Sequence, residues 1–543
     1  MVARWWGCDR VPTQVSIGNR TRATIKALPA APHRPRPYGM VSAIPDNSMH
    51  EQHYDAIIIG AGLGGLLSAA QLLQRGKSVA ILERLPHCGG RFTAKTFQGV
   101  QVSTGAVHMI PFGSSGVLAR MLSRLRTPHR IFDADVFASF HVHGKQMRAR
   151  GLLGVLRMLG PRQSFWFARA GYLMFLRPLP SNERDLPFDQ WLARHIDVKR
   201  NRELTSFFER ISRFALSLEL HQVRTSEVIK TTKNMLRFGA PGIVEGGCGA
   251  LTAELERQVL DQGADLRLQH DVLQILHAEG QATGVRARNK ASGEELALLA
   301  PLVVSDIGPR ATDALLHNRQ ITQHEVLKKN VEARFNAPDP QEAVGLKVHI
   351  LSDVSLIPHK GIMYCLDTQR IAGIVQPTNC DPRLAPAGKH LLISHQVIQS
   401  DNIEEEKQLA LADLRVLFGE TFEKHCRILT MSVYRGEWPV NRVAQGADVT
   451  PDTFIQGLYL VGDAVKPSGY LMVEGVAQSV NQFLDLIDTA EEDAGSQSIV
   501  SNRGDSDTTG PALPSRMRGP RNVLPPPSRL NTLRWLWEAP GNS

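Results

Sequence analysis

The fold is decided by one stretch of the chain, Tyr54-Asp55-Ala56-Ile57-Ile58-Ile59-Gly60-Ala61-Gly62-Leu63-Gly64-Gly65. Its first half is a short apolar run typical of a buried parallel strand, and its second half fits the pattern GxGxxG. A helical pattern follows as far as Gly76, and a second apolar run over 78–82 then ends at Glu83. Strand, glycine loop, helix, strand and acid follow one another in the order of a dinucleotide-binding unit.

Each part of this unit has a physical reason. Gly60 permits a tight turn, Gly62 lets the backbone approach a pyrophosphate, and Gly65 lets helix and strand pack closely. The first turn of the helix offers unpaired N–H groups and a positive dipole end to phosphate oxygens. Glu83 is placed to accept hydrogen bonds from a ribose. The predicted cofactor-binding residues of this unit are Gly60, Gly62, Leu63, Gly64, Gly65, Glu83 and Arg84.

A second glycine pair, Gly89-Gly90, follows shortly after this acid and leads into Arg91. Two further glycines and a guanidinium let more backbone and a fixed positive charge reach the same pyrophosphate. We therefore add Gly89, Gly90 and Arg91 to the predicted site. The alternative is an ordinary glycine turn that carries a solvated arginine.

Two later segments complete the pattern. Residues 242–306 contain an amphipathic helix that ends at Gly263, then several short strands, and close on Leu302-Val303-Val304-Ser305-Asp306. Near the end of the chain, a buried strand ends at Gly462-Asp463, and a loop leads to a helix that begins near Glu474-Gly475-Val476.

Together these motifs resemble the phytoene dehydrogenase-related family of FAD oxidoreductases, which includes carotenoid desaturases, carotenoid isomerases and retinol saturases. The resemblance extends from Tyr54 to about Ile487. It implies an α/β fold of the two-dinucleotide-binding-domain type, with a Rossmann-like FAD domain and an interleaved α+β substrate domain. FAD is the implied cofactor. The loop 464–470 departs from the Gly/Pro-richer loop expected of typical carotenoid desaturases.

The resemblance also implies further cofactor contacts. Val272 is expected near the adenine, although a core valine in a β-ribbon is the alternative. An acid after a strand can accept from the ribityl chain, and a helix N-terminus can stabilise negative charge on reduced flavin. The residues implied by these roles are Gly462, Asp463, Glu474, Gly475 and Val476.

The implied reaction is hydride transfer at flavin N5 with a hydrophobic, isoprenoid- or carotenoid-like substrate, in the sense of desaturation, isomerisation or saturation. A flavin amine oxidase and a non-catalytic prenyl-lipid escort protein on the same architecture are the alternatives. Lys466 and Tyr470 lie in the loop expected near the flavin and are the catalytic candidates. The simpler interpretation makes Lys466 a solvated lysine and Tyr470 a packing residue.

The resemblance divides the chain into interleaved segments. The two ends, 1–48 and 491–543, are rich in Pro and Arg and are expected to be disordered. The remaining boundaries place the FAD-binding domain at 49–110, 241–314 and 451–490, and the substrate domain at 111–240 and 315–450.

The net charge of the 543-residue chain is +9, but it is not spread evenly. Residues 1–48 hold seven basic and two acidic groups, and residues 497–543 hold six and three, so the body between them is near neutral. This distribution argues against a nucleic-acid partner. The six cysteines are scattered without a CxxC, so no disulfide scaffold or metal site is predicted. We expect a cytoplasmic protein, or an organellar one if 1–48 is a presequence.

An apolar segment at 151–179 is punctuated by Arg157, Arg162, Arg169 and Arg177 and is broken into two helices by Pro161. Apolar residues with interspersed arginines suit a helix in a membrane interface, where a lipid-soluble substrate could enter. The alternative is a helical cap over the substrate cavity. Either way, we expect a hydrophobic small molecule as the partner, and a peripheral membrane surface in the first case.

Overall fold

A five-stranded parallel sheet lies at the centre of the nucleotide-binding half of the protein. A computed structural model describes residues 52–501, apart from 106–108, 137, 150 and 318–341. The sheet order is β10-β3-β2-β14-β20. Its strands are β2 (Ala56–Ile59), β3 (Val79–Glu83), β10 (Asp265–Leu268), β14 (Leu302–Ser305) and β20 (Leu458–Leu460). The apolar runs at 54–59, 78–82 and 302–306 are therefore the inner strands, as predicted.

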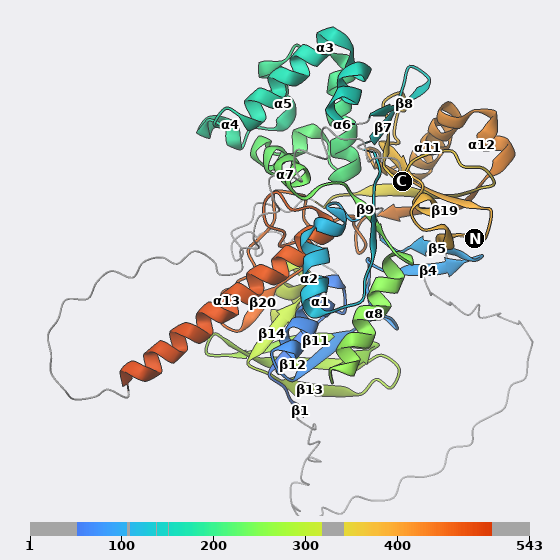
Figure 1. The fold of residues 1–543 in the computed structure, drawn as a ribbon. Coiled ribbons are helices and arrows are strands. Elements are labelled where there is room, and N and C mark those ends of the chain that lie inside the picture. Colours follow the sequence, from blue (N-terminus) through green and yellow to red (C-terminus); the bar gives the residue numbers. More distant parts are fainter. Residues whose placement is uncertain (1–51, 106–108, 137, 150, 318–341, 502–543) are drawn as a thin grey trace, which may run out of the picture. The chain divides into compact units, whose positions relative to one another are not determined.

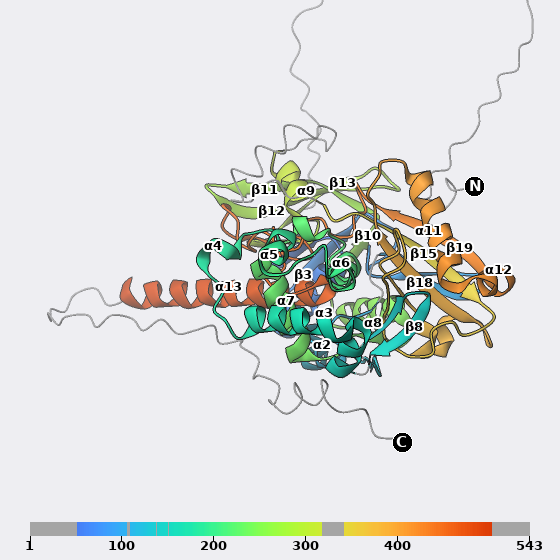
Figure 2. The same ribbon diagram turned by 90° about the horizontal axis from the view of Figure 1, so that it is seen from above.

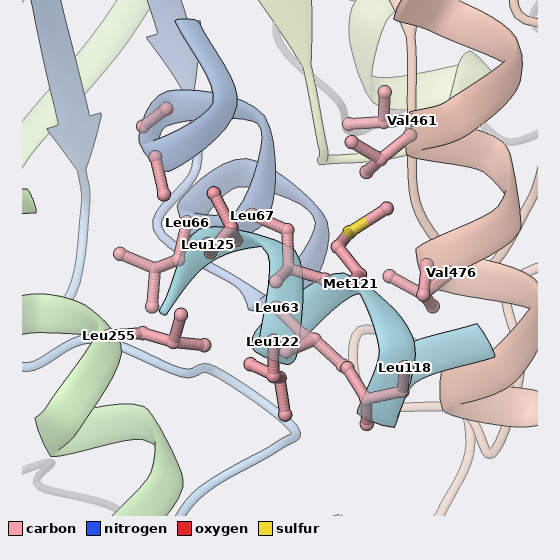
Figure 3. Packing of buried hydrophobic residues seen from close by; sticks show 14 of the residues in the cluster. Leu63, Leu66, Leu67, Leu118, Met121, Leu122, Leu125, Leu255, Val461 and Val476 are labelled. Atoms are coloured by element: carbon pink, nitrogen blue, oxygen red, sulfur yellow. The ribbon is translucent and has the colours of Figure 1, made fainter. Parts of the chain in front are cut away.

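Four helices cover one face of this sheet. They are α1 (Leu63–Gln74), α2 (Val117–Leu125), α8 (Gly247–Asp261) and α13 (Met472–Ser501). Figure 3 shows how Leu66, Leu67, Met121, Leu255 and Val476 from these helices meet in one apolar cluster. Because α1 begins directly at the glycine loop, this packing fixes where the first turn of α1 points.

A four-stranded sheet of order β1-β13-β12-β11, antiparallel except for the β1–β13 pair, covers the other face. It consists of β1 (Gln52–His53), β11 (His270–Ala278), β12 (Gln281–Asn289) and β13 (Glu295–Leu299). Ile57 and Leu82 of the parallel sheet pack against Val285 and Leu298 of this layer. Short α9 (Pro309–Leu316) follows β14. Helices, parallel sheet and β-layer make the three-layered Rossmann-like domain that the sequence predicted.

A second, seven-stranded sheet has the order β19-β15-β18-β17-β16-β7-β8 and is antiparallel except for the β16–β7 pair. Its strands are β7 (Ala138–Val142), β8 (Lys145–Ala149), β15 (Gly345–Ser352), β16 (Met363–Cys365), β17 (Gly373–Val375), β18 (His390–Val397) and β19 (Cys426–Tyr434). Helices α11 (Ile403–Phe418) and α12 (Glu420–His425) lie beside β19 in both views, Figure 1 and Figure 2. Val348 and Leu392 on this face pack against Leu414 of α11.

A group of helices lies together near β7 and β8 (Figure 1). It consists of α3 (Gly151–Phe175), α4 (Ser181–Arg184), α5 (Phe188–His195), α6 (Arg202–Ala215) and α7 (Thr225–Phe238). The predicted break in the apolar segment is present in α3, where Gly160 has a φ of 70° immediately before Pro161. In the described residues, no helix is long and apolar enough to cross a membrane.

Two further sheets have two antiparallel strands each. They are β4 (Ala94–Phe97) with β5 (Val100–Ser103), and β6 (Ile131–Asp133) with β9 (Gly242–Val244). The chain thus has the predicted α/β architecture, in which a Rossmann-like domain is interleaved with an α+β part. The exact segment boundaries stay predictions.

One predicted boundary is wrong. The disordered tail was expected from residue 491, but α13 continues to Ser501. Proline, which would end a helix, first occurs at residue 511. Arg75 and Lys77 also form ion pairs with Asp488 (2.6 Å) and Glu491 (3.1 Å) on this helix. The expectations for 1–48 and for 502–543 lie outside the described residues.

Candidate functional site

The predicted cofactor residues converge on one cavity of about 590 Å³. Its walls come from the β2–α1 loop, the end of β3, the glycine pair, β11, the loop after β14, the segment 436–443 and the start of α13. The predicted residues that line it are Gly60, Gly62, Leu63, Gly64, Glu83, Arg84, Gly89, Gly90, Arg91, Val272, Asp463 and Val476. Segments distant in sequence therefore meet around one space, and their contact with a cofactor stays a prediction.

The glycine loop leads into the first turn of α1 at the wall of the cavity. Gly60 has a φ of 96°, which favours glycine, and a methyl group built on Gly65 would lie 2.0 Å from the Gly60 carbonyl oxygen. Gly65 thus permits the close packing of helix and strand predicted for it. Gly62 is the N-cap of α1, without a side-chain cap and without an acid in the first turn. The acid at this end of the helix is instead supplied from another part of the chain, by Asp306, which accepts from the Gly65 N–H.

Glu83 ties the end of β3 to the glycine loop. Its carboxylate oxygens accept hydrogen bonds from the backbone N–H groups of Ala61 and Leu85, both at 2.8 Å. These bonds hold the side chain in the wall of the cavity although it is only 6% exposed. The acid predicted for ribose recognition therefore has a fixed position beside the glycine loop.

Asp306 is a site residue that the sequence prediction missed. It follows β14 directly, and its Oδ2 accepts a hydrogen bond from the Gly65 N–H at 3.0 Å. Methyl groups built on Gly62, Gly64 and Gly462 would lie 2.3, 2.6 and 2.2 Å from its oxygens. Burial raises the pKa of Asp306 to about 7. The available signal was an acid immediately after a buried apolar strand next to the one that carries Gly60.

Asp463 lies between two arginines. Its Oδ1 is 2.6 Å from Arg91 Nη2 and 2.8 Å from Arg442 Nη1, and its Oδ2 accepts from the Arg442 N–H at 2.7 Å. Burial opposes ionisation, but Arg91 and Arg442 together hold the pKa of Asp463 well below its usual range. Arg442 was missed because nothing in the local sequence marks it. The predicted ribityl contact of Asp463 stays a prediction.

Four of the predicted residues are not among the described residues that line the cavity: Gly65, Gly462, Glu474 and Gly475. Glu474 is buried and accepts a hydrogen bond from the Leu118 N–H at 2.9 Å, so it caps the start of α2. Burial raises the pKa of Glu474 to about 7. These residues hold helices in place around the cavity.

The two catalytic candidates also lie outside the described wall of the cavity. Lys466 is 2% exposed and forms a buried ion pair with Asp448 at 2.6 Å, so the interpretation as a solvated lysine is wrong. Tyr470 packs against Phe112 and Phe238 with ring centroids 6.3 Å apart in each case, as expected of a packing residue. A catalytic role for either stays a prediction.

The chemistry of the wall suits a dinucleotide. The first turn of α1 and the guanidinium groups of Arg84 and Arg91 offer donors for pyrophosphate oxygens. Arg310 and Arg442 add positive charge to the same wall. The Asp306 carboxyl lies against the glycine loop and already accepts from the Gly65 N–H. The arginines and the remaining N–H groups of the first turn of α1 are the groups that fit the dinucleotide implied by the motifs.

Comparisons with known proteins agree with this geometry. Residues 58–125 match the family described as NAD(P)-binding Rossmann-like domain. An uncharacterized protein of Methanocaldococcus jannaschii is 32% identical over 434 residues, covering 80% of this chain and 99% of the relative. The solved structure of an oxidoreductase from Methanosarcina mazei is 32% identical, with a TM-score of 0.70, covering 79% of this chain and 99% of that one.

A more distant similarity connects the chain to carotenoid enzymes. The phytoene desaturase (neurosporene-forming) of Rhodobacter capsulatus is 28% identical over 298 residues, which cover 49% of this chain and 54% of the relative. The matched family, the near-complete overlap with an oxidoreductase and this similarity all agree with the motifs around the cavity. The chain belongs to the phytoene dehydrogenase-related family of oxidoreductases.

Proposed function

We propose that this protein binds FAD in the 590 Å³ cavity and is an oxidoreductase acting on a hydrophobic, isoprenoid- or carotenoid-like substrate. The observation that carries the proposal is the convergence of the glycine loop, Glu83, Arg91 and Asp463 on one space. Bound FAD would supply hydride acceptance or donation at its N5 atom, which side chains alone cannot provide.

The residues of the chain have separable tasks in this proposal. The first turn of α1 and Arg91 would hold the pyrophosphate, and Glu83 would hold the ribose. Asp463 fixes Arg91 by the 2.6 Å ion pair, so this guanidinium cannot turn away from the cavity.

The proposal is tested first by FAD occupancy. The variant Gly62→Val is expected to purify without FAD, because its side chain would enter the space between the loop and Asp306, where even a methyl group would lie 2.3 Å from Oδ2. The matched control is Gly171→Val in α3, where a Cβ meets nothing within 4 Å. Flavin absorbance of the purified proteins gives the occupancy. A yellow Gly62→Val protein with full occupancy would show that the site is elsewhere.

The reaction is tested by anaerobic bleaching and reoxidation of the flavin against carotenoids, retinoids, prenyl lipids and amines. Bleaching or reoxidation by an isoprenoid supports the proposal. Bleaching by an amine alone would replace it with the amine oxidase alternative. A protein that stays colourless after FAD reconstitution but binds prenyl lipid would be an escort protein.

We also propose that α3 and the residues after it rest on an anionic membrane surface. One side of this segment is buried in the helical group, through Val155 and Leu173 among others. The other side exposes Leu153 (57%), Phe165 (65%), Tyr172 (56%) and Leu176 (76%). The exposed arginines among them are Arg157, Arg162, Arg169 and Arg177. Exposed apolar groups flanked by arginines match the two-part attraction of an interfacial helix.

Vesicle flotation tests this surface. The unaltered protein is expected to float with vesicles of phosphatidylcholine and phosphatidylglycerol, and the double variant Phe165→Ser/Leu176→Ser is expected to remain in solution. The control is Val416→Ser, which removes an equally exposed apolar side chain (59%) from α11. If both variants floated equally well, α3 would not be the surface that binds the membrane.

A further inference from the structure

A buried polar cluster lies on one face of the seven-stranded sheet and takes no part in the site described above. It consists of Lys347 and His349 on β15 and His395 on the neighbouring strand β18, and we call it the inner-face cluster. Lys347 and His395 are directly paired across the two strands. All three residues are at most 1% exposed. Alternation along β15 places them opposite to Val348, which packs towards α11.

His349 is the unusual member of this cluster. Within the described part of the chain, neither of its ring nitrogens has a hydrogen-bond partner. Burying a polar group without a partner costs free energy that an apolar side chain of similar size would not cost. Neutral histidine has one N–H donor and one acceptor nitrogen, so a ligand carbonyl oxygen can accept from the N–H, and a ligand hydroxyl can bond either nitrogen. Burial also lowers the pKa of His349 well below its usual range, which keeps the ring neutral.

Lys347 connects the cluster to the chain that follows the glycine pair. Its Nζ donates to Ser103 Oγ at 2.7 Å and to the Gly105 carbonyl oxygen at 2.5 Å. The Tyr434 hydroxyl donates to the same carbonyl at 3.1 Å. Burial lowers the pKa of Lys347 to about 7. At neutral pH, a large fraction of the protein molecules therefore carry this side chain as an uncharged amine.

The cluster also adjoins the dinucleotide cavity. A methyl group built on Gly345 would lie 2.7 Å from His395 Cε1 and 3.0 Å from Val440 Cγ2, so these two side chains flank the same glycine. Val440 lines the dinucleotide cavity, and its carbonyl oxygen accepts from Arg91 Nη1 at 3.3 Å. Through His395, the cluster therefore lies next to a residue of the cavity wall, and His349 follows four residues after Gly345 on β15.

A second, small cavity of about 40 Å³ lies beside the cluster. Ser103, which binds Lys347, and Ile393, which pairs with His349 across the strands, both line it. The remaining lining is mostly apolar. The residues that contribute it include Met109, Ile243, Val244 and Leu391. A cavity of this size has room for only the end group of a molecule, and its lining suits an end group that is apolar except for one polar atom.

We propose that the substrate carries a carbonyl or hydroxyl oxygen on its apolar chain, and that the inner-face cluster receives this oxygen with His349 as its hydrogen-bond partner. This inference rests on the proposed function and narrows its substrate class. An unsubstituted hydrocarbon polyene has no atom that could satisfy His349, so it is the poorer ligand.

Calorimetric binding to the FAD-reconstituted protein tests the inference with two probes of isoprenoid build. The ketone farnesylideneacetone is expected to bind about tenfold more tightly than the hydrocarbon β-farnesene, the ratio that one hydrogen bond of ordinary strength gives. His349→Leu is expected to abolish this preference, because its affinity for the ketone falls while its affinity for the hydrocarbon stays the same. The proposal would be overturned if the unaltered protein bound both probes equally or did not bind the ketone. It would also be overturned if His349→Leu kept the preference for the ketone.

Thermal unfolding separates this role from a structural one. Because His349 has no partner to lose in the described residues, His349→Leu is expected to unfold at the same or a higher temperature. The control is His359→Leu, since His359 is buried but bonded to Ser139 Oγ at 2.7 Å and to the Gly361 N–H at 3.1 Å. It is expected to be less stable yet to keep the ketone preference. A clear loss of stability in His349→Leu would assign that ring a packing role and overturn the proposal.

Calorimetry needs no redox turnover, so the two failures can be told apart. A protein that takes up no FAD refutes the proposed function directly. A flavoprotein bleached or reoxidised by hydrocarbon polyenes, with no preference for the ketone, refutes only the inference about the oxygen substituent.

Discussion

Replacing Asp306 by asparagine is expected to make the stability of the protein much less dependent on pH. The folded chain holds a proton on this carboxyl up to about pH 7, because burial raises its pKa from 3.8. The unfolded chain releases the same proton near pH 4. Between these values the folded form binds more protons, so the unfolding free energy contributed by Asp306 falls as pH rises. Asparagine stays neutral and its side-chain oxygen can still accept from Gly65.

The magnitude follows from the two pKa values. At about 1.4 kcal/mol for each pH unit, the gap between 3.8 and about 7 corresponds to at most about 4 kcal/mol. Over the accessible interval from pH 5 to pH 8.5, the same linkage gives about 2.5 kcal/mol. Between pH 5 and pH 8.5, the unfolding free energy of the unaltered protein is therefore expected to fall by about 2.5 kcal/mol more than that of Asp306→Asn.

Urea unfolding at several pH values, followed by tryptophan fluorescence, measures this difference. The matched control is Asp401→Asn, an exposed aspartate ahead of α11 whose removal is expected to leave the pH profile unchanged. Parallel stability profiles for Asp306→Asn and the unaltered protein would refute the reasoning. They would mean that Asp306 is ionised in the folded chain throughout this range.

Three further substitutions test the packing around the cavity. Lys466→Met leaves Asp448 buried without its 2.6 Å partner and is expected to cost about 3 kcal/mol in urea unfolding, most of which Asp448→Leu restores in the double variant. Gly65→Ala places a methyl group 2.0 Å from the Gly60 carbonyl oxygen and is expected to lower the thermal midpoint or the soluble yield. Asp463→Asn is expected to cost about 2–3 kcal/mol at pH 7 and less in acid, because the low pKa of Asp463 stabilises the fold only above the pH at which it is protonated. Acid unfolding followed by circular dichroism checks this, and an unchanged acid midpoint would contradict it.

Much of the nucleotide-binding half could be predicted because its signals are local. The apolar runs of β2 and β14 are buried on both faces, so they read as continuous hydrophobic stretches. Gly65 could be assigned a packing role from its spacing alone. The same holds for the break at Pro161, which follows from the missing N–H of proline.

The missed features depend on contacts between distant residues. Lys466 is buried because Asp448 neutralises it, and the loop that contains both shows no periodic pattern. Arg442 joins the site only through Asp463. His349 alternates with apolar neighbours on β15 as any half-buried strand residue would, so only the three-dimensional surroundings show that its ring nitrogens lack partners.

The strand order of the parallel sheet affects how the chain can fold while it is being synthesised. β2 emerges early, but its neighbour β14 is made some 245 residues later, and β20, on the far side of β14, comes near residue 460. More than half of the chain must therefore be synthesised before β14, which Asp306 follows, can pair with β2 beside the glycine loop. Long-range parallel pairing of this kind is slow and exposes apolar strands meanwhile. The wall of the cavity is therefore complete only after most of the chain has been made.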